Sequence, residues 1–196
     1  MPISIRSMRI PGSWKNGYVL DYHTESSDFL GHDEYGHPRF DTVRTDVGEL
    51  LYRLKYGGKK EALKDLVDVS TEFIRKWDPP VEAIVPVPPS RVRASQPVLE
   101  FATKLAEAFK LPLHDVVRRK PTKKELKNVF EYHERIELLE DAHEVVGNSV
   151  RNRAVLLVDD LYRSGATLNA VTAALYKQGE VTGVFAFALT RTRSSS

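Results

Sequence analysis

The chain has 196 residues, of which 41% are hydrophobic, and its 29 basic and 27 acidic residues give a formal net charge of +2. This length suits one domain with or without an appendage, and the near balance of charge does not by itself indicate a nucleic-acid-binding protein. The chain contains no cysteine, which excludes disulfide bonds and cysteine-ligated zinc. No apolar run is long enough for a signal peptide or a membrane-spanning helix, so we expect a cytoplasmic protein without membrane contact.

The N-terminal region is polar and contains many aromatic residues, glycines and histidines. Short strands are indicated at 18–21 and 39–42. His23, His32 and His37 raise the alternative of a metal site. Their spacing of nine and five residues fits no standard zinc pattern, however, and no cysteine is present to complete one. A turn-rich surface segment is therefore the favoured interpretation.

From residue 47 onward, helical and strand-like patterns alternate. Leucines at helical spacing predict helix over 47–77, with a break at Gly57 and Gly58. The remaining predicted elements are strand 81–89, helix 97–109, strands 114–118, 144–146 and 155–158, helix 168–177 and strand 183–189. Strands that alternate with helices predict an α/β fold with a mostly parallel, doubly wound sheet flanked by helices.

The most informative stretch begins with the apolar strand 155–158, which is directly followed by Asp159 and Asp160. The next loop, 163–167, contains a glycine and two hydroxyl residues and leads into a helix. In open α/β sheets, ligands bind outside the carboxyl ends of the strands. The free N–H groups at the start of a helix bind phosphate. Acids beside such a loop predict a ligand with hydroxyl groups, a metal or both, as in a phosphorylated sugar.

Three other interpretations of this acid pair have to be weighed, and the sequence argues against the first two. A Walker B strand requires a partner loop of the form G-x-x-x-x-G-K-[ST], which the chain lacks. A phospho-receiver domain carries its paired acids near its N-terminus rather than at Asp159 of a chain of this length. The third interpretation is an ordinary strand end with two solvated carboxylates.

A second anion site is indicated where strand 83–88 ends. Ser90, Arg91 and Arg93 follow this strand and precede a predicted helix. Guanidinium groups match the geometry of phosphate, so these arginines suit an anion, although arginines in loops are more often simply solvated.

The stretch 155–168 resembles the phosphoribosyl-pyrophosphate (PRPP) signature of type I phosphoribosyltransferases. The resemblance implies that Asp159 and Asp160 are the catalytic acids, which hold the ribose hydroxyls and bind Mg²⁺ directly or indirectly. It implies a pyrophosphate site at Ser90, Arg91 and Arg93. The residues that it implies for the 5′-phosphate are Arg163, Ser164, Gly165, Ala166 and Thr167. Arg163 stands where many members carry threonine. The implied reaction transfers phosphoribose to a nitrogenous acceptor, which the sequence does not identify, with release of pyrophosphate.

Further motifs resemble the ComF-like branch of this family, which is related to amidophosphoribosyltransferases. They are Leu50–Gly58, Ile84–Pro88 and Arg118–Thr122. The chain keeps an arginine-rich loop ending in Gln96 but lacks the Gly-Phe-Asn core common in that loop, and it lacks the four-cysteine zinc ribbon with which typical members begin. The resemblance implies a hood-like segment over 1–46, a phosphoribosyltransferase-like domain over 47–193 and a tail over 194–196. It also makes a homodimer an expectation by analogy.

The segment 118–135 carries seven positive and three negative charges. The resemblance implies a flexible loop here that closes over the active site with Lys120, Lys123 and Lys124. An alternative is a surface for single-stranded DNA, and a solvated amphipathic helix is the plainer interpretation. Two other functions therefore stay open: a non-catalytic ComF-like DNA-uptake or DNA-processing factor that binds single-stranded DNA or a partner protein, and a sensor that binds PRPP or a nucleotide without turnover.

Overall fold

The computed structural model of the chain describes residues 3–57, 60–90, 96–120 and 142–193. Its helices are α1 (Asp46–Tyr56), α2 (Lys60–Trp77), α3 (Pro97–Phe109) and α5 (Ala166–Lys177). Its strands are β1 (Met8–Arg9), β2 (Asn16–Tyr22), β3 (Thr24–His32), β4 (Pro38–Arg44), β5 (Ala83–Pro86), β6 (Val117–Arg119), β7 (His143–Val145), β8 (Ala154–Tyr162) and β9 (Gly183–Arg191). Among the described residues, no helix is long and apolar enough to cross a membrane.

The central sheet has five strands in the order β1-β2-β9-β8-β5. Strands β2, β9, β8 and β5 are parallel, and only the short edge strand β1 is antiparallel. This arrangement confirms the predicted α/β class with a mostly parallel sheet. All four parallel strands end at one edge, so the loops that follow them meet there.

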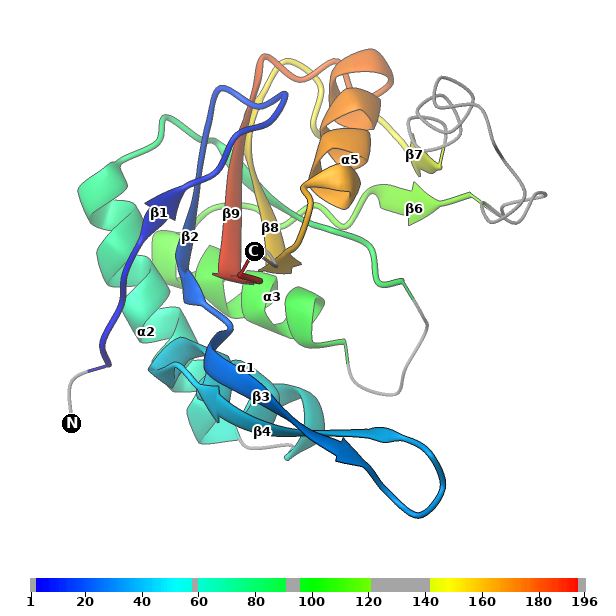
Figure 1. The fold of residues 1–196 in the computed structure, drawn as a ribbon. Helices are drawn as coiled ribbons and strands as arrows, with labels where there is room; N and C mark the ends of the chain where they lie inside the picture. The colour runs from blue at the N-terminus through cyan, green and yellow to red at the C-terminus, as the bar shows by residue number, and fades with distance from the viewer. Residues whose placement is uncertain (1–2, 58–59, 91–95, 121–141, 194–196) are drawn as a thin grey trace.

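Helices cover both faces of this sheet (Figure 1). Along β8, Leu156 and Val158 pack toward α1, α2 and α3, whereas Val155 and Leu157 pack toward α5. Successive side chains of a strand point to opposite faces, which explains why this strand is apolar without alternation. Packing on both faces of the sheet therefore fixes the position of the C-terminal end of β8.

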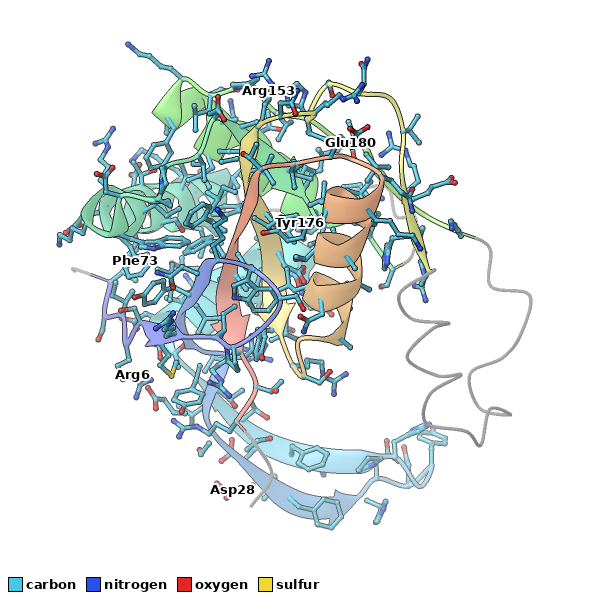
Figure 2. The ribbon with its side chains drawn as sticks, turned by 90° about the horizontal axis from the view of Figure 1, so that it is seen from above. Arg6, Asp28, Phe73, Arg153, Tyr176 and Glu180 are labelled. Carbon is cyan, nitrogen blue, oxygen red and sulfur yellow. The ribbon has the colours of Figure 1, made fainter. Side chains whose placement is uncertain are left out.

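The first 46 residues contribute to two different parts of the molecule. Strands β1 and β2 belong to the central sheet, because β2 pairs in parallel with β9. Strands β3 and β4 form a separate antiparallel hairpin that projects from the body, with Asp28 on its projecting part (Figure 2). Residue 46 is therefore not the border of the central sheet, and only the hairpin lies apart from it.

Two predicted strands differ in detail from the structure. The strand predicted over 155–158 continues through both acids to Tyr162, since β8 keeps pairing with β9 up to that residue. The strand predicted over 114–118 is displaced: β6 pairs with β7 in a small separate sheet, and Leu113 makes a single parallel bridge to Ile84 at the edge of the central sheet. In both cases the ends of the strand are determined by pairing with a distant segment, which the local sequence pattern does not reveal.

Candidate functional site

A cleft of about 720 Å³ lies at the carboxyl ends of β5 and β8. The end of β5 contributes Pro86–Ser90 to its wall, and β8 contributes both acids. Lys55 from α1 and Arg119 from β6 line it as well. Loops from two neighbouring parallel strands thus meet at one cavity, which is the usual place for a ligand in this class of fold.

The two acids at the end of β8 point to opposite faces of the sheet. Asp160 lies on the side of α1, where Lys55 reaches it. Asp159 borders a second, smaller cavity of about 140 Å³ that is formed with the loop 161–168 leading into α5. Both side chains are half-buried and both line the main cleft. Because β8 remains a regular strand here, its alternation separates two acids that are adjacent in sequence.

Asp159 has an unusual protonation equilibrium. Burial raises its pKa from an ordinary 3.8 to about 7, and the neighbouring Asp160 carboxylate adds to the rise. The backbone N–H of Asp160, which donates to Asp159 Oδ1 at 2.8 Å, and the charge of Lys55 act in the opposite direction. No described residue forms an ion pair with Asp159. The ionised form of Asp159 is therefore disfavoured in the folded protein. A cation or a hydroxyl donor in the cleft would stabilise this form.

Asp160 forms an ion pair with a lysine, whereas no described residue forms one with Asp159. The Lys55 Nζ atom lies 2.6 Å from Asp160 Oδ2, and the two side chains are only 20% and 21% exposed. Lys55 lies in the last turn of α1. The start of this helix is anchored by its N-cap Thr45, which accepts a hydrogen bond from the Gly48 N–H and donates one to the Tyr22 carbonyl. A side chain at Gly48 would overlap the carbonyl oxygen of His23, so the glycine permits this close approach.

His23 and Thr190 lie behind Asp160. The Thr190 hydroxyl donates to the backbone carbonyl of Asp160 at 3.1 Å, and His23 Nδ1 lies 3.3 Å from the same hydroxyl oxygen. Burial lowers the pKa of His23 below its ordinary value, and the positive charges of Lys55 and Arg44 lower it further. His23 is therefore neutral at neutral pH and links the N-terminal region to the acid pair.

The loop between β8 and α5 has the geometry of an anion-binding turn. Gly165 is the N-cap of α5 with φ +78°, a left-handed conformation that favours glycine. A Cβ atom at this position would lie 2.9 Å from the Tyr162 ring. The N-cap Gly165 offers no side chain to cap α5, and the Ser164 hydroxyl oxygen accepts a hydrogen bond from the Ala166 N–H at 3.5 Å. The N–H groups of a first helical turn have no partner within their own helix. The Arg163, Ser164 and Thr167 side chains are exposed around them, with Ala166 between.

The predicted pyrophosphate and flexible-loop residues are only partly within the described chain. Ser90 lines the cleft, and its carbonyl accepts a hydrogen bond from Arg119 Nη1 at 3.3 Å. The Lys120 N–H donates to the Ala142 carbonyl, where the described chain resumes. Four predicted residues lie outside the described residues: Arg91, Arg93, Lys123 and Lys124.

The structure adds residues to the site that the sequence interpretation did not assign. Lys55 and Thr190 are the clearest additions, and Arg119 joins from β6. The sequence held one signal for Lys55, which is a lysine directly before the helix-ending Tyr56-Gly57 in a motif already singled out. Thr190 had no such signal, because it follows a run of apolar residues near the end of β9 and belongs to none of the motifs singled out.

The acid pair suits a hard divalent cation. Carboxylate oxygens are the protein ligands that Mg²⁺ prefers, and Mg²⁺ typically keeps several waters and takes its remaining ligands from substrate phosphates. The described residues contain no group of three or more metal-ligating side chains, so a cation here would depend on Asp159, Asp160 and a bound ligand. The donor set therefore fits Mg²⁺ that arrives with a phosphorylated substrate.

The chain is similar in sequence to one known protein and in structure to several others. The chain is 30% identical to the competence protein ComFC of Bacillus subtilis (strain 168) over 151 residues, which are 76% of this chain and 62% of that protein. It thus spans less than two thirds of that relative. The adenine phosphoribosyltransferases of Leishmania tarentolae and Leishmania donovani are similar in structure, each with a TM-score of 0.49, at 15% and 14% identity. Those alignments cover 96% and 94% of this chain and 94% and 86% of theirs. No family model matches the sequence.

The α/β fold with a mostly parallel central sheet flanked by helices is the fold that the resemblance to type I phosphoribosyltransferases predicted. The similarity to ComFC is consistent with the ComF-like branch that the sequence motifs indicated.

Proposed function

We propose that the protein is a Mg²⁺-dependent, PRPP-binding phosphoribosyltransferase that transfers phosphoribose to a nitrogenous acceptor and releases pyrophosphate. The observation that supports it best is the position of the acid pair. Asp159 borders the cavity of the turn before α5, and both acids line the cleft that reaches Ser90. A ribose held at the acids has a 5′-phosphate position on one side and a diphosphate position on the other, as the substrate requires.

The proposed reaction requires the protein to position the sugar and to stabilise the departing pyrophosphate. In the proposed reaction the bond between the anomeric carbon and pyrophosphate breaks as a bond to the acceptor nitrogen forms. Asp159 and Asp160 orient the ribose hydroxyls and hold Mg²⁺, which supplies charge neutralisation for the diphosphate when bound. The N–H groups in the first turn of α5 and the hydroxyls of Ser164 and Thr167 bind the 5′-phosphate. Ser90, Arg91 and Arg93 bind pyrophosphate, and Lys120, Lys123 and Lys124 close over it.

The N-terminal 46 residues are the proposed source of the acceptor site. Figure 1 shows the β3–β4 hairpin projecting beyond the carboxyl ends of β8 and β9, and His23 at its base adjoins the acid pair through Thr190. A neutral histidine in this position suits contact with an uncharged nitrogenous acceptor. The nitrogenous nature of the acceptor, a cytoplasmic location and a homodimer stay predictions.

The name of the relative ComFC favours a second candidate function, a competence-related role in which the fold binds single-stranded DNA or a protein partner without turnover. A sensor that binds PRPP or a nucleotide is another non-catalytic alternative, because it too would bind its ligand without turnover. Turnover separates them from the enzyme: the enzyme releases pyrophosphate when PRPP meets its acceptor, whereas the non-catalytic forms do not.

Isothermal titration of PRPP, with and without Mg²⁺, tests the proposal. We expect Mg²⁺-dependent micromolar binding by the wild type and at least a hundredfold weaker binding by the Asp159→Asn, Asp160→Asn double variant, because two charge-assisted contacts are lost. The pair Asp65→Asn, Asp68→Asn on α2, of which Asp65 is half-buried and Asp68 exposed, removes the same charge away from the cleft and serves as the control. Intact PRPP affinity in the first double variant would reject the proposed site.

A further inference from the structure

Lys55 makes the best-shielded lysine–carboxylate pair in the described part of the chain. Its Nζ atom lies 2.6 Å from Asp160 Oδ2, with side chains that are 20% and 21% exposed. The Lys64–Asp68 pair on α2 has the same 2.6 Å separation, but its side chains are 75% and 60% exposed. Exposed pairs of that kind contribute little because water and salt screen them. The Lys55 pair is screened less, so its charge acts strongly on the cleft.

The position of Lys55 also sets it apart from the other basic residue in the last turn of α1. Cations at a helix C-terminus interact favourably with the helix dipole, which alone would account for a lysine here. Arg53 fills that role on the surface and pairs with Glu49 four residues earlier. Lys55 instead leaves its own helix and pairs with an acid of the candidate site.

This pairing means that one acid of the site already carries an internal counter-charge. A divalent cation that binds Asp160 competes with the ammonium at Oδ2, because two positive charges at one carboxylate repel each other. Lysine suits such an exchange: its four-carbon stem is flexible and its ammonium group is a compact charge. Lys55 lines the same cleft as Ser90 and Arg119, so a short rotation of its stem carries Nζ toward the proposed diphosphate position.

We propose that Lys55 is a positioning residue that acts as an exchangeable counter-charge: it holds Asp160 in the free protein and moves to the diphosphate when a divalent cation takes its place. This inference rests on the proposed function for the identity of the phosphate ligand. It accounts for a shielded lysine at an acid pair that must also admit a cation. A purely structural ion pair would instead hold α1 against β8 in every ligand state.

The two roles predict opposite effects of Lys55→Met. Without the competing ammonium, we expect the acid pair to bind Mn²⁺ alone, used as the probe cation, about tenfold more tightly. Without the phosphate contact, we expect PRPP with Mg²⁺ to bind about tenfold more weakly, the factor that 1.4 kcal/mol represents. Both affinities are measured by isothermal titration of the full chain. Lys64→Met removes the same charge and an ion pair of equal length, so it should match the wild type in both titrations. A structural role for Lys55 would leave the Mn²⁺ affinity unchanged or lower, and that result would overturn the inference.

The Mn²⁺ titration also separates this inference from the proposed function. If the wild type fails to bind PRPP, the proposed function fails, while tighter Mn²⁺ binding by Lys55→Met still supports the counter-charge. If the wild type binds PRPP and Lys55→Met alters neither affinity, the counter-charge fails alone. Lys55→Arg keeps the charge and should bind Mn²⁺ as the wild type does.

A measurement on the wild type covers the case in which Lys55→Met does not fold. Amine acetylation followed by peptide mass spectrometry reports how free each lysine is. Mn²⁺ should speed the acetylation of Lys55 at least threefold relative to Lys64, because the ammonium is released from Asp160. Acetylation of Lys55 that is insensitive to Mn²⁺ would contradict the proposal.

Discussion

The two faces of the sheet meet at the end of β8, where they hold the same kind of side chain in different electrostatic environments. On the α1 face, Asp160 is neutralised by Lys55 and its carbonyl is held by Thr190. On the α5 face, Asp159 has a raised pKa, and its surroundings offer backbone N–H groups rather than a lysine. The difference shows that adjacency in sequence does not imply a shared role: a regular strand delivers one acid to each face, so each can be tuned by a different helix.

The largest expected effect concerns the α5 face. Gly165→Ala should lower the free energy of unfolding by about 3 kcal/mol, because alanine is strained at φ +78° and its Cβ would press on the Tyr162 ring. Gly36→Ala is the matched control, since Gly36 has φ +79° but nothing within 4 Å of an added Cβ. We expect about 1 kcal/mol there, from backbone strain alone. Urea unfolding measures both. Equal losses would mean that the turn before α5 is not tightly packed.

The next effect depends on pH and separates the two acids directly. The folded state raises the pKa of Asp159 from 3.8 to about 7, so it favours the protonated form. This contribution to stability is fully present below about pH 4 and is lost as the pH rises through 7. Asp159→Asn should therefore raise the free energy of unfolding by about 2 kcal/mol over the wild type at pH 8, a value reduced because the side chain is partly exposed. At pH 4 the same substitution should change it by almost nothing.

Asp160→Asn provides the contrast in the same experiment. It leaves the shielded Lys55 without its carboxylate, so we expect a loss of stability at pH 8 rather than a gain. Urea unfolding at pH 4 and pH 8 reads both variants. If the two variants change stability in the same direction at pH 8, the conclusion that the two acids lie in different electrostatic environments is wrong.

The smallest expected effect tests the support behind Asp160. Thr190→Val removes the hydroxyl that donates to the Asp160 carbonyl and contacts His23, which should cost about 1 kcal/mol of stability. Thr190→Ser keeps the hydroxyl and should preserve most of that contribution. Thermal unfolding compares the two, and a Thr190→Ser variant less stable than Thr190→Val would show that packing of the methyl group, rather than the hydrogen bonds, is what matters.

Local chemistry in the sequence predicted much of this molecule. Helix α3 runs from Pro97 to Phe109 as predicted, because a proline suits the first turn and an apolar stripe follows it. The apolar run of β8 and the hydroxyl-containing turn before α5 were also recognisable, since each depends on neighbouring residues only.

Features that depend on distant partners escaped prediction. The pairing of β2 with β9 joins segments from opposite ends of the chain, and no residue of β2 specifies its neighbour. The ion pair between Lys55 and Asp160 has the same origin, because it requires α1 to pack across β8. The placement of the two acids on opposite faces followed from β8 continuing past Val158, which only its ladder with β9 decides.

The strand order has a consequence for how the protein is made. Strand β9 is the last element along the described chain, yet it lies between β2 and β8 in the middle of the sheet. During synthesis from the N-terminus, β2 and β8 must wait with open edges until residues 183–191 leave the ribosome. The sheet that carries the acid pair therefore closes in a late step across a large sequence separation, which slows folding and exposes strand edges to wrong partners. Nascent chains of this protein should depend on chaperones that shield unpaired strands.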